Sequence, residues 1–471
     1  MCQIVHVYCK IVSTFFLRTA ARIAAAPFRN WEEQTSAMNN EQQGSVNARE
    51  TNGVSLIFRA LRYPNYRLFF GGQSISLIGT WMQRIAMSWL VYRLTHSVFL
   101  LGVVGFAGQI PTFLFAPFAG VLADRWNRHR TLIVTQTLAL LQALVLAILV
   151  LTGTVEVWHI VVLAIILGAV NALDMPVRQS FIVQMIEGKE NLGNAIALNS
   201  SMVNAARLIG PSVAGMLIAA FGEGVCFLVN ALSYLAVIAA LLAMKIAPVR
   251  AQPYSGHVIE KLKEGFSYAF GFAPIRYIIL LLALVSLMGM PYQVLMPVFA
   301  KDVLGGGPHT LGFLMGASGL GALVGTVFLA AKKGVRGFGL LIAIATAIFG
   351  IGLIAFSLSH VVWFSMLFVL VAGFGMMVQM ASSNTVLQTV VDDDKRGRVM
   401  SLFTMAFMGM APFGSLLAGV LANRIGAQNT LLMGGGVCIA GAALFATRLR
   451  TIRKTLHPVY CKMGMMPEIS P

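Results

Sequence analysis

The sequence predicts an all-α membrane protein with twelve transmembrane helices in two pseudo-symmetric six-helix bundles. Three observations lead to this fold class. Of the 471 residues, 58% are apolar and only 11% are charged, whereas soluble domains carry roughly 25% charged residues. From residue 66 onward the chain is a series of apolar runs of about 20 residues, the length that a helix needs to cross a bilayer. The longest polar interval among these runs divides them six and six.

Residues 1–65 differ in composition from the rest of the chain. The stretch Ile11–Ala26 is basic and mildly apolar, and Asn30–Asn52 is rich in Glu, Gln, Asn and Ser, a composition typical of disorder. Arginines interrupt the apolar part, which favours an N-terminal extension, with translation starting upstream of Met38, over a signal peptide. We therefore expect a disordered cytoplasmic extension over 1–65, with a signal peptide as the alternative.

The first bundle is expected over residues 66–246 and the second over residues 275–450. Several of the apolar runs contain Pro or Gly, which spanning helices tolerate better than soluble ones. The predicted helices lie near residues 69–94, 99–123, 131–153, 158–181, 193–221, 224–246, 276–300, 309–331, 337–358, 361–389, 398–424 and 428–449.

The polar interval between the bundles, residues 247–274, is expected to be a cytoplasmic linker. Within it, the apolar residues of His257–Phe270 fall near one helical face and the charged residues elsewhere. This pattern predicts an amphipathic helix on the cytoplasmic membrane surface, with a solvated linker as the alternative. A cytoplasmic tail, residues 451–471, follows the last predicted helix.

The net charge of +17 is explained by where the basic residues lie. If both termini are cytoplasmic, only Arg93, Lys301 and Arg424 of the 34 Lys and Arg fall on the outer side, and only Arg84 and Arg207 are embedded in helices away from their ends. This bias agrees with the positive-inside rule. It predicts a multi-pass protein of the inner membrane with both termini cytoplasmic, and no nucleic-acid partner is needed to explain the charge.

The most informative motif follows the second predicted helix and reads Gly120-Val-Leu-Ala-Asp124-Arg125-Trp-Asn-Arg128-His-Arg130. Gly120 permits close approach of a neighbouring helix, and Asp124 can accept a hydrogen bond from a helix N-terminus or a guanidinium. Such a contact can form in one conformation and break in another, so Gly120, Asp124, Arg125 and Arg128 form a candidate cytoplasmic gate. An ordinary positive-inside loop is the alternative, but it would explain the arginines and not the spacing.

This segment resembles the signature loop of the major facilitator superfamily, G-x-L-a-D-R-x-G-R-R, over a chain that matches the superfamily's layout from about residue 55 to 450. Asn127 and His129 stand where the family usually has Gly and Arg. Asn tolerates the left-handed conformation better than most residues, so we expect the turn to be kept. The resemblance implies the major facilitator fold and transport by alternating access, with a central cavity lined by helices 1, 4, 5, 7, 10 and 11.

Three further segments, Leu77–Arg84, Asn171–Gln179 and Asn204–Pro211, resemble the branch of this superfamily that contains the enterobactin exporter and related drug and macrolide exporters. The piece Gly210-Pro211-x-x-x-Gly215 resembles the helix-5 motif of the superfamily's exporters, although Ala206 and Ala214 stand where glycines are common. Export rather than import is what the resemblance implies.

Polar side chains form a stripe along the first predicted helix, and two more lie one turn apart on the fifth predicted helix. A charge at the bilayer centre costs at least ~2.5 kcal/mol on insertion scales, so Arg84 and Arg207 should face a cavity or a partner. A fixed polar contact between helices is the alternative for both arginines. The candidate substrate-pathway residues are Gln73, Ser76, Gln83, Arg84, Asn204 and Arg207.

Two more patterns concern contacts between helices. Asp174 and Arg178 lie one turn apart near the cytoplasmic end of the fourth predicted helix and are expected to brace the gate. The pairs Gly312/Gly316 and Gly321/Gly325 in the eighth predicted helix predict close helix packing.

The sequence shows no phosphate-binding loop, no nucleophile–base pairing and no metal-ligand spacing. We therefore expect no enzyme activity, no cofactor and no metal, and a secondary transporter whose coupling ion, by the resemblance, is the proton. No deeply placed Asp or Glu stands out as a proton carrier.

The expected function is export of a siderophore-like or amphipathic small molecule by a protein that works as a monomer. Its expected partners are this substrate, the proton and the lipid bilayer. A broad multidrug exporter is the alternative of the same class, and a non-transporting membrane scaffold or secretion component is the alternative of another class.

Overall fold

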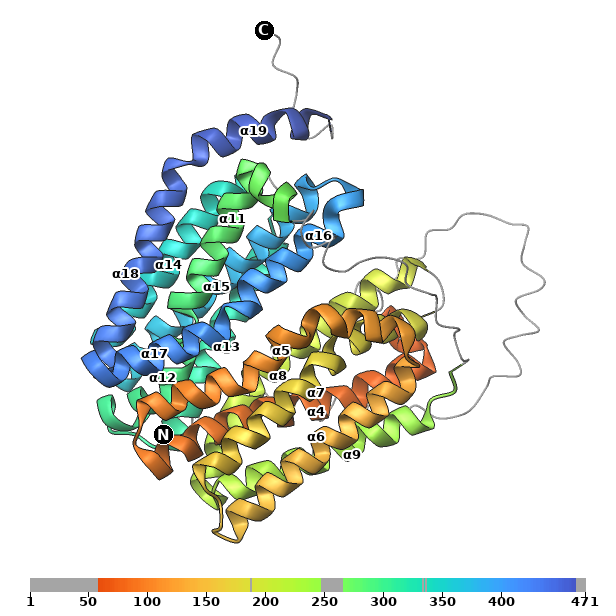
Figure 1. Cartoon of the computed structure of the whole chain (residues 1–471), viewed down its shortest axis with the longest axis vertical. Helices are drawn as coiled ribbons and strands as arrows, with labels where there is room; N and C mark the ends of the chain where they lie inside the picture. Colours follow the sequence, from red (N-terminus) through yellow and green to blue (C-terminus); the bar gives the residue numbers. More distant parts are fainter. Residues whose placement is uncertain (1–57, 187–188, 247–265, 333, 335–336, 463–471) are drawn as a thin grey trace, which may run out of the picture. The chain divides into compact units, whose positions relative to one another are not determined.

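The computed structural model describes residues 58–186, 189–246, 266–332, 334 and 337–462 (Figure 1). Within these ranges, the side chains of residues 116–125, 189–190, 393–394 and 456–462 lie outside the description. The chain divides into two compact units, Met1–Arg59 and Ala60–Pro471. Because the description starts at residue 58, the predicted extension over 1–65 lies almost entirely outside the described residues. The helical bundle belongs to the second unit.

Each of the twelve predicted helices corresponds to a helix or a broken helix. The one-turn helix η1 (Arg59–Arg62) precedes them. The helices of the first half are α4 (Pro64–Thr95), α5 (Val98–Arg125), α6 (Arg128–Leu151), α7 (Val157–Gln184), α8 (Lys189–Phe221) and α9 (Glu223–Ala243). Between the halves, residues 266–271 are helical, whereas residues 257–265 of the predicted amphipathic helix lie outside the described residues.

The second half contains two helices that are interrupted by π-helical turns. The seventh predicted helix is α11 (Ala273–Leu284), η2 (Val285–Gly289), α12 (Tyr292–Val298) and η3 (Phe299–Val303) in succession, and the eleventh is α16 (Asp393–Thr404), η4 (Met405–Gly409) and α17 (Ala411–Ile425). The others are α13 (Pro308–Ala330), α14 (Phe338–Leu358), α15 (Val362–Val390) and α18 (Ala427–Thr447). A further helix, α19 (Leu449–Lys462), follows within the predicted tail.

Eleven helical segments of the described residues are long and apolar enough to cross a membrane. The remaining long helix, α4, has 32 residues, but its central turns carry Ser76, Thr80, Gln83 and Arg84 and it is not among the eleven. The all-helical membrane fold is thus confirmed for the described residues, and the twelfth span stays a prediction.

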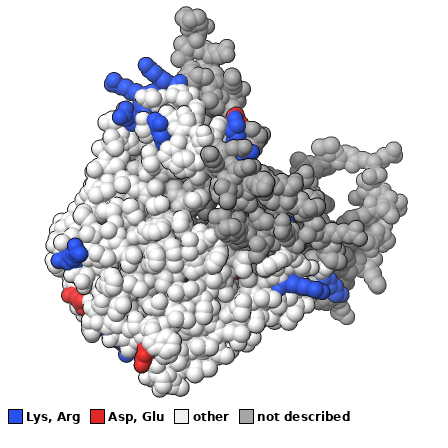
Figure 2. Space-filling model, in the orientation of Figure 1, with Lys and Arg blue, Asp and Glu red and all other residues white. Residues whose placement is uncertain are grey.

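Exposed apolar side chains recur along the outside of the bundle, for example Leu138, Leu141, Val145 and Ile148 on α6. In a membrane protein this is expected, because the surrounding lipid is as apolar as these side chains. Figure 2 shows most of the visible Lys and Arg at the upper and right edges of one face, with a broad uncharged surface between them. That distribution suits a protein whose middle is in lipid and whose charged ends are in water.

Most of the contact between the halves comes from two helix pairs, α5 with α17 and α8 with α13. Glycines make both crossings close. A Cβ built on Gly215 would lie 2.9 Å from the Cα of Gly312, and one on Gly102 would lie 2.8 Å from the Cα of Gly419. Larger residues at these positions would push the helices apart.

The glycine pairs of α13 are confirmed as packing positions. Gly312 and Gly316 face α8, with Gly316 against the hydroxyl of Ser212, whereas Gly321 lies against the backbone of Leu370 on α15. One helix thus uses its small residues to approach a neighbour in each half.

Candidate functional site

Two arginines on different helices share one tryptophan. The guanidinium carbon of Arg84 lies 4.9 Å from the centroid of the Trp81 ring, and that of Arg207 lies 5.7 Å from it. Both distances are within cation–π range. Arg84 and Trp81 belong to α4 and Arg207 to α8, each near the middle of its helix. Arg84 is exposed, and Trp81 and Arg207 are half-buried.

Neither of these arginines forms an ion pair with a described residue. The ion pairs of the described chain join Arg93 to Glu223, Arg178 to Asp174 and Lys395 to Asp392. Two like charges therefore lie around one indole ring, and no carboxylate of the described residues pairs with either of them. Uncompensated cations within spanning helices are costly and typically mark a functional position.

The remaining residues of the α4 stripe are buried between helices. Gln73, Ser76 and Gln83 are each at most 2% exposed. The Gln83 amide donates to Gln142 Oε1 at 2.8 Å and accepts from Asn230 Nδ2 at 2.5 Å. Gln83 thus joins α4 to α6 and α9. This is a fixed polar contact between helices, the role that was the stated alternative for the two arginines.

Asn204 is half-buried on α8, and its Nδ2 donates to the carbonyl oxygen of Ser200 at 2.9 Å. Of the six candidate pathway residues, only Arg84, Asn204 and Arg207 are more than slightly exposed. The tryptophan that the two arginines share was not among the predicted site residues.

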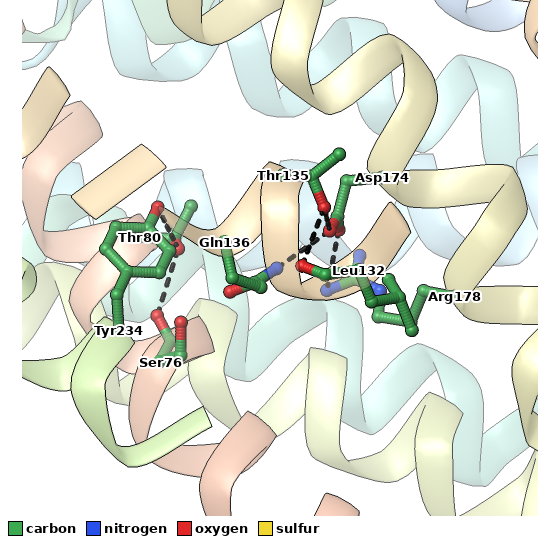
Figure 3. Close-up of polar contacts among 8 residues, drawn as sticks. All are labelled: Ser76, Thr80, Leu132, Thr135, Gln136, Asp174, Arg178 and Tyr234. Atoms are coloured by element: carbon green, nitrogen blue, oxygen red, sulfur yellow. Dashed lines mark hydrogen bonds and ion pairs between the residues drawn. The ribbon is translucent and has the colours of Figure 1, made fainter. Parts of the chain in front are cut away.

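Asp174 is the centre of a second polar network, shown in Figure 3. Its Oδ1 accepts hydrogen bonds from Thr135 Oγ1 at 2.8 Å and from Gln136 Nε2 at 2.7 Å, and its Oδ2 lies 3.8 Å from Arg178 Nη1. Asp174 and Arg178 thus form an ion pair within α7, and the hydrogen bonds from Thr135 and Gln136 join α7 to α6. The expected bracing of the gate by Asp174 and Arg178 stays a prediction.

The depth of Asp174 corrects two expectations. Asp174 is only 4% exposed, and along Val157–Gln184 it lies about 5 Å past the midpoint of the helix. The expectations of a position near the helix end and of no deeply placed carboxylate are both wrong. The sequence pattern could not show the burial, because Thr135 and Gln136 come from a different helix.

Tyr234 contacts the polar stripe of α4. Its hydroxyl lies 3.3 Å from Thr80 Oγ1, which donates to the carbonyl oxygen of Ser76 (Figure 3). Tyr234 is buried on α9. Gln136 Oε1 is buried without a hydrogen-bond partner among the described residues.

The predicted gate falls partly outside the description. The backbone of Gly120, Asp124 and Arg125 belongs to α5, but their side chains lie outside the described residues. Arg128 is the first residue of α6. The structure therefore leaves the proposed Asp124 contact as a prediction.

The two departures from the family loop have structural roles. Asn127 has φ −67° and caps α6, with Oδ1 accepting from the Arg130 backbone N–H at 3.1 Å. The expected left-handed turn at Asn127 is wrong, because capping requires an extended backbone there. His129 Nε2 lies 2.7 Å from the carbonyl oxygen of Leu241 on α9 and its ring stacks on Phe181.

The exporter-like motif lies at two close helix contacts. A Cβ on Gly210 would lie 2.5 Å from Trp81 Cβ, so this glycine brings α8 against the tryptophan of the two arginines. Pro211 and Gly215 face the other half, since a Cβ on Gly312 would lie 2.7 Å from the Pro211 carbonyl oxygen. The motif therefore lies between the two-arginine site and the contact between the halves.

Another contact between the halves involves residues that no sequence motif indicated. The hydroxyl of Tyr92, near the end of α4, donates to the carboxylate of Asp302 in η3. Lys301 Nζ lies 5.8 Å from the centroid of the Tyr92 ring. The only signal in the sequence was the adjacent charged pair Lys301-Asp302 at the end of an apolar run.

Comparison with known proteins gives a consistent result. A family model described as "Transmembrane secretion effector" matches residues 57–461. The staphyloferrin A transporter of Staphylococcus aureus is 27% identical over 388 residues, covering 81% of this chain and 96% of that protein. Macrolide efflux protein A of Streptococcus pyogenes is 24% identical, with coverages of 83% and 98%. The multidrug efflux pump Tap of Mycolicibacterium fortuitum is 24% identical, with coverages of 79% and 93%.

Solved structures share the fold at low sequence identity. A bacterial homologue of the human lysosomal transporter Spinster superposes with a TM-score of 0.63 at 14% identity, covering 83% of this chain and 98% of that one. A POT family transporter in complex with a thioalcohol conjugated peptide gives a TM-score of 0.67 at 12% identity, with coverages of 82% and 96%.

Proposed function

Because the chain belongs to the transmembrane secretion effector family of the major facilitator superfamily, we propose that it exports a siderophore-like or amphipathic small molecule across the inner membrane. The observation that carries this proposal is the pair of arginines on Trp81, near the middle of α4 and α8, which have no acidic partner among the described residues. A scaffold that moves no solute has no use for charges placed there at such cost.

The proposed orientation has both termini in the cytoplasm. It is supported by the distribution of Lys and Arg, which concentrates them in the loops assigned to the cytoplasm. Export is then movement of the substrate from the end that carries the Asp124 loop toward the end that carries Tyr92 and Asp302.

The proposed mechanism is alternating access, in which the two halves rock about a central pathway. The close glycine crossings of α8 with α13 and α5 with α17 support it, because smooth helix faces can separate and rejoin without breaking a polar network. The Asp124 loop is proposed to latch the cytoplasmic side, and the pathway is proposed to pass Arg84, Asn204 and Arg207.

Proton coupling is part of the proposal, and Asp174 is the residue that we assign to it. A carboxylate that is almost fully buried near the middle of a spanning helix is a typical position for a proton carrier. Its surroundings contain both a cation, Arg178, and neutral donors, Thr135 and Gln136. Either charge state of Asp174 can therefore be accommodated.

Reconstitution into proteoliposomes with an imposed pH gradient tests this function. Siderophores, macrolides and cationic dyes are offered in turn, and gradient-dependent movement of at least one compound is expected. Asp124→Asn should abolish that movement while the protein still inserts into the membrane. No gradient-dependent movement of any compound would contradict the transporter function, and unchanged movement in Asp124→Asn would remove the gate.

A broad multidrug exporter remains the second candidate, because macrolide and multidrug efflux proteins are among the relatives. It predicts comparable transport of chemically unrelated compounds. Transport restricted to siderophore-like compounds would favour the first candidate, as would a gene neighbourhood of siderophore biosynthesis.

A further inference from the structure

We propose that Arg84, Trp81 and Arg207 form a binding site for an oxyanion, so that the exported molecule carries at least one carboxylate on an apolar or aromatic body. This inference rests on the proposed function and narrows its substrate class. It selects anionic amphipathic molecules and disfavours cationic ones.

The charge balance of the site requires an anion. Each carboxylate described near these helices already has a partner: Asp174 binds Thr135, Gln136 and Arg178, Glu223 binds Arg93 at 2.7 Å, and Asp302 binds Tyr92. Arg84 and Arg207 have no such partner among the described residues. Two guanidinium groups facing one ring repel each other, and a bound oxyanion would reverse that repulsion.

Neither guanidinium group donates a hydrogen bond to a residue that the structure describes. In a cation–π contact the flat face of a guanidinium lies against the ring, and its N–H groups lie at the edge. The contacts at 4.9 and 5.7 Å position the two groups without using these donors in any hydrogen bond to the described chain. Arginine edges match a carboxylate through two parallel hydrogen bonds.

The surroundings of Trp81 suit an amphipathic molecule. Trp81 packs against a small apolar cluster that includes Leu77 on the same helix and Met202 and Ala206 on α8. Apolar and cationic groups are thus adjacent on the same two helices. Leu77, Met202 and Ala206 are themselves buried, so the apolar part of a substrate would contact the partly buried Trp81, Ile78 and Val203 at the edge of this cluster while its carboxylate contacts the arginines.

The site also borders the second half of the molecule. A Cβ on Gly319 of α13 would lie 3.0 Å from the Cα of Leu208 and 3.2 Å from the carbonyl oxygen of Arg207. Any separation of α8 from α13 therefore alters the surroundings of Arg207 directly. This location suits a substrate site in an alternating-access transporter, because binding there can respond to the position of both halves.

The test uses two fluorescent probes that share a xanthene core and differ in charge, the anion 5-carboxyfluorescein and the cation rhodamine 6G. Fluorescence anisotropy of each probe is titrated with the purified full-length protein. We expect 5-carboxyfluorescein to bind more tightly than rhodamine 6G. Arg84→Gln and Arg207→Gln should each weaken its binding about tenfold, a change of about 1.4 kcal/mol.

Matched variants separate a specific site from general charge. Arg67→Gln removes an exposed arginine from the same helix and should leave binding of 5-carboxyfluorescein unchanged. Arg207→Lys keeps the charge but loses the planar donor fork, so its binding should fall between those of the wild type and Arg207→Gln. If Arg207→Gln does not elute as a folded monodisperse protein, the affinity of Arg207→Lys for 5-carboxyfluorescein tests this residue instead.

Three results would overturn the anion site: rhodamine 6G bound at least as tightly as the anion, affinity for the anion unchanged in both arginine variants, or equal loss in Arg67→Gln. Transport assays keep the two proposals apart. Export of rhodamine 6G that is insensitive to Arg84 and Arg207 would leave the exporter standing and refute the anion site. Arginine-dependent binding with no gradient-driven movement of any compound would support the site and refute export.

Discussion

At Asp174 one carboxylate brings together donors from two helices. Thr135 and Gln136 supply neutral hydrogen bonds, and Arg178 supplies a charge at the longer distance of 3.8 Å. Protonation would weaken the interaction with Arg178 and leave the neutral donors near an oxygen that can still accept. Since Arg178 is on α7 like Asp174, a single proton changes a contact within α7 while the hydrogen bonds from α6 keep the carboxyl group bonded.

Asp174→Asn is expected to remove the effect of the pH gradient on transport. Asparagine keeps the shape of the side chain and the acceptor for Thr135 and Gln136, but it binds no proton. The gradient-driven export rate should fall by about tenfold or more, the change that about 1.4 kcal/mol produces. The measurement is efflux from proteoliposomes at several imposed pH gradients.

Asp392→Asn is the matched control for this substitution. Asp392 is exposed and lies 3.8 Å from Lys395, and an exposed pair of this kind contributes at most about 1 kcal/mol to stability. The gradient-driven export rate of Asp392→Asn should stay close to that of the wild type. If Asp174→Asn retains the full dependence on the pH gradient, Asp174 is not the coupling residue.

The interrupted helices of the second half have a common cause in the sequence. The turn η2 ends at Gly289 in the run Met288-Gly289-Met290-Pro291, and η4 ends at Gly409 in the run Met408-Gly409-Met410-Ala411-Pro412. A proline therefore follows shortly after each of these two turns. Proline has no N–H to continue the ladder, and a wider turn before it changes the hydrogen-bond register, as the Met290 N–H to Val285 C=O bond shows. The Ser286 hydroxyl donates to the carbonyl oxygen of Phe407, so the two wide turns are bonded to each other.

At the scale of helix pairs, Gly215→Ala should weaken the contact between α8 and α13. The added methyl group would lie 2.7 Å from the Pro308 carbonyl oxygen and 2.9 Å from Gly312 Cα, both of them backbone atoms. Such overpacking costs about 1–3 kcal/mol. We expect a lower unfolding temperature in detergent and slower export, because the conformation in which α8 and α13 pack together loses a close contact between the halves.

The same substitution at Gly193 controls for the intrinsic effect of alanine. Gly193 lies on α8 and a Cβ there meets no atom within 4 Å. Replacing a glycine by alanine in an open helical position stabilises the helix by about 0.5–1 kcal/mol. Equal behaviour of Gly193→Ala and Gly215→Ala in both measurements would show that the crossing at Gly215 contributes nothing specific.

For the whole molecule, the orientation in the membrane is the property to test. Thr154 lies in the exposed connection between α6 and α7, and Lys454 is exposed on α19. The labelling uses a background that carries the substitutions Cys2→Ser, Cys9→Ser and Cys461→Ser. In intact cells, a membrane-impermeant maleimide should label Thr154→Cys introduced into this background. It should label Lys454→Cys only after the cells are permeabilised.

The native cysteines do not interfere with this measurement. Cys226 and Cys438 are buried and free, so the reagent does not reach them. Labelling of Lys454→Cys but not of Thr154→Cys in intact cells would mean that the orientation inferred from the arginines and lysines is reversed.

The sequence by itself determined the helical elements and their order. Every predicted run matches a described helix or broken helix, because the bilayer thickness sets the length of a run and water at both ends sets its limits. The sequence did not show which individual polar residues are buried. Gln83 and Arg84 are adjacent in one stripe, yet Gln83 is bonded to α6 and α9 while Arg84 faces Trp81 without an acidic partner among the described residues.

Only the tertiary structure decided which residues belong together. It joined Arg84 to Arg207 through Trp81, surrounded Asp174 with donors from α6, and brought Gly215 against Gly312 across the two halves. The physical reason is that helix formation depends on local spacing and solvent, whereas these contacts depend on how distant helices cross. Asp174 and Thr135 are 39 positions apart in the chain, and the other pairs are farther apart still. No periodicity within one helix encodes the identity of its neighbour.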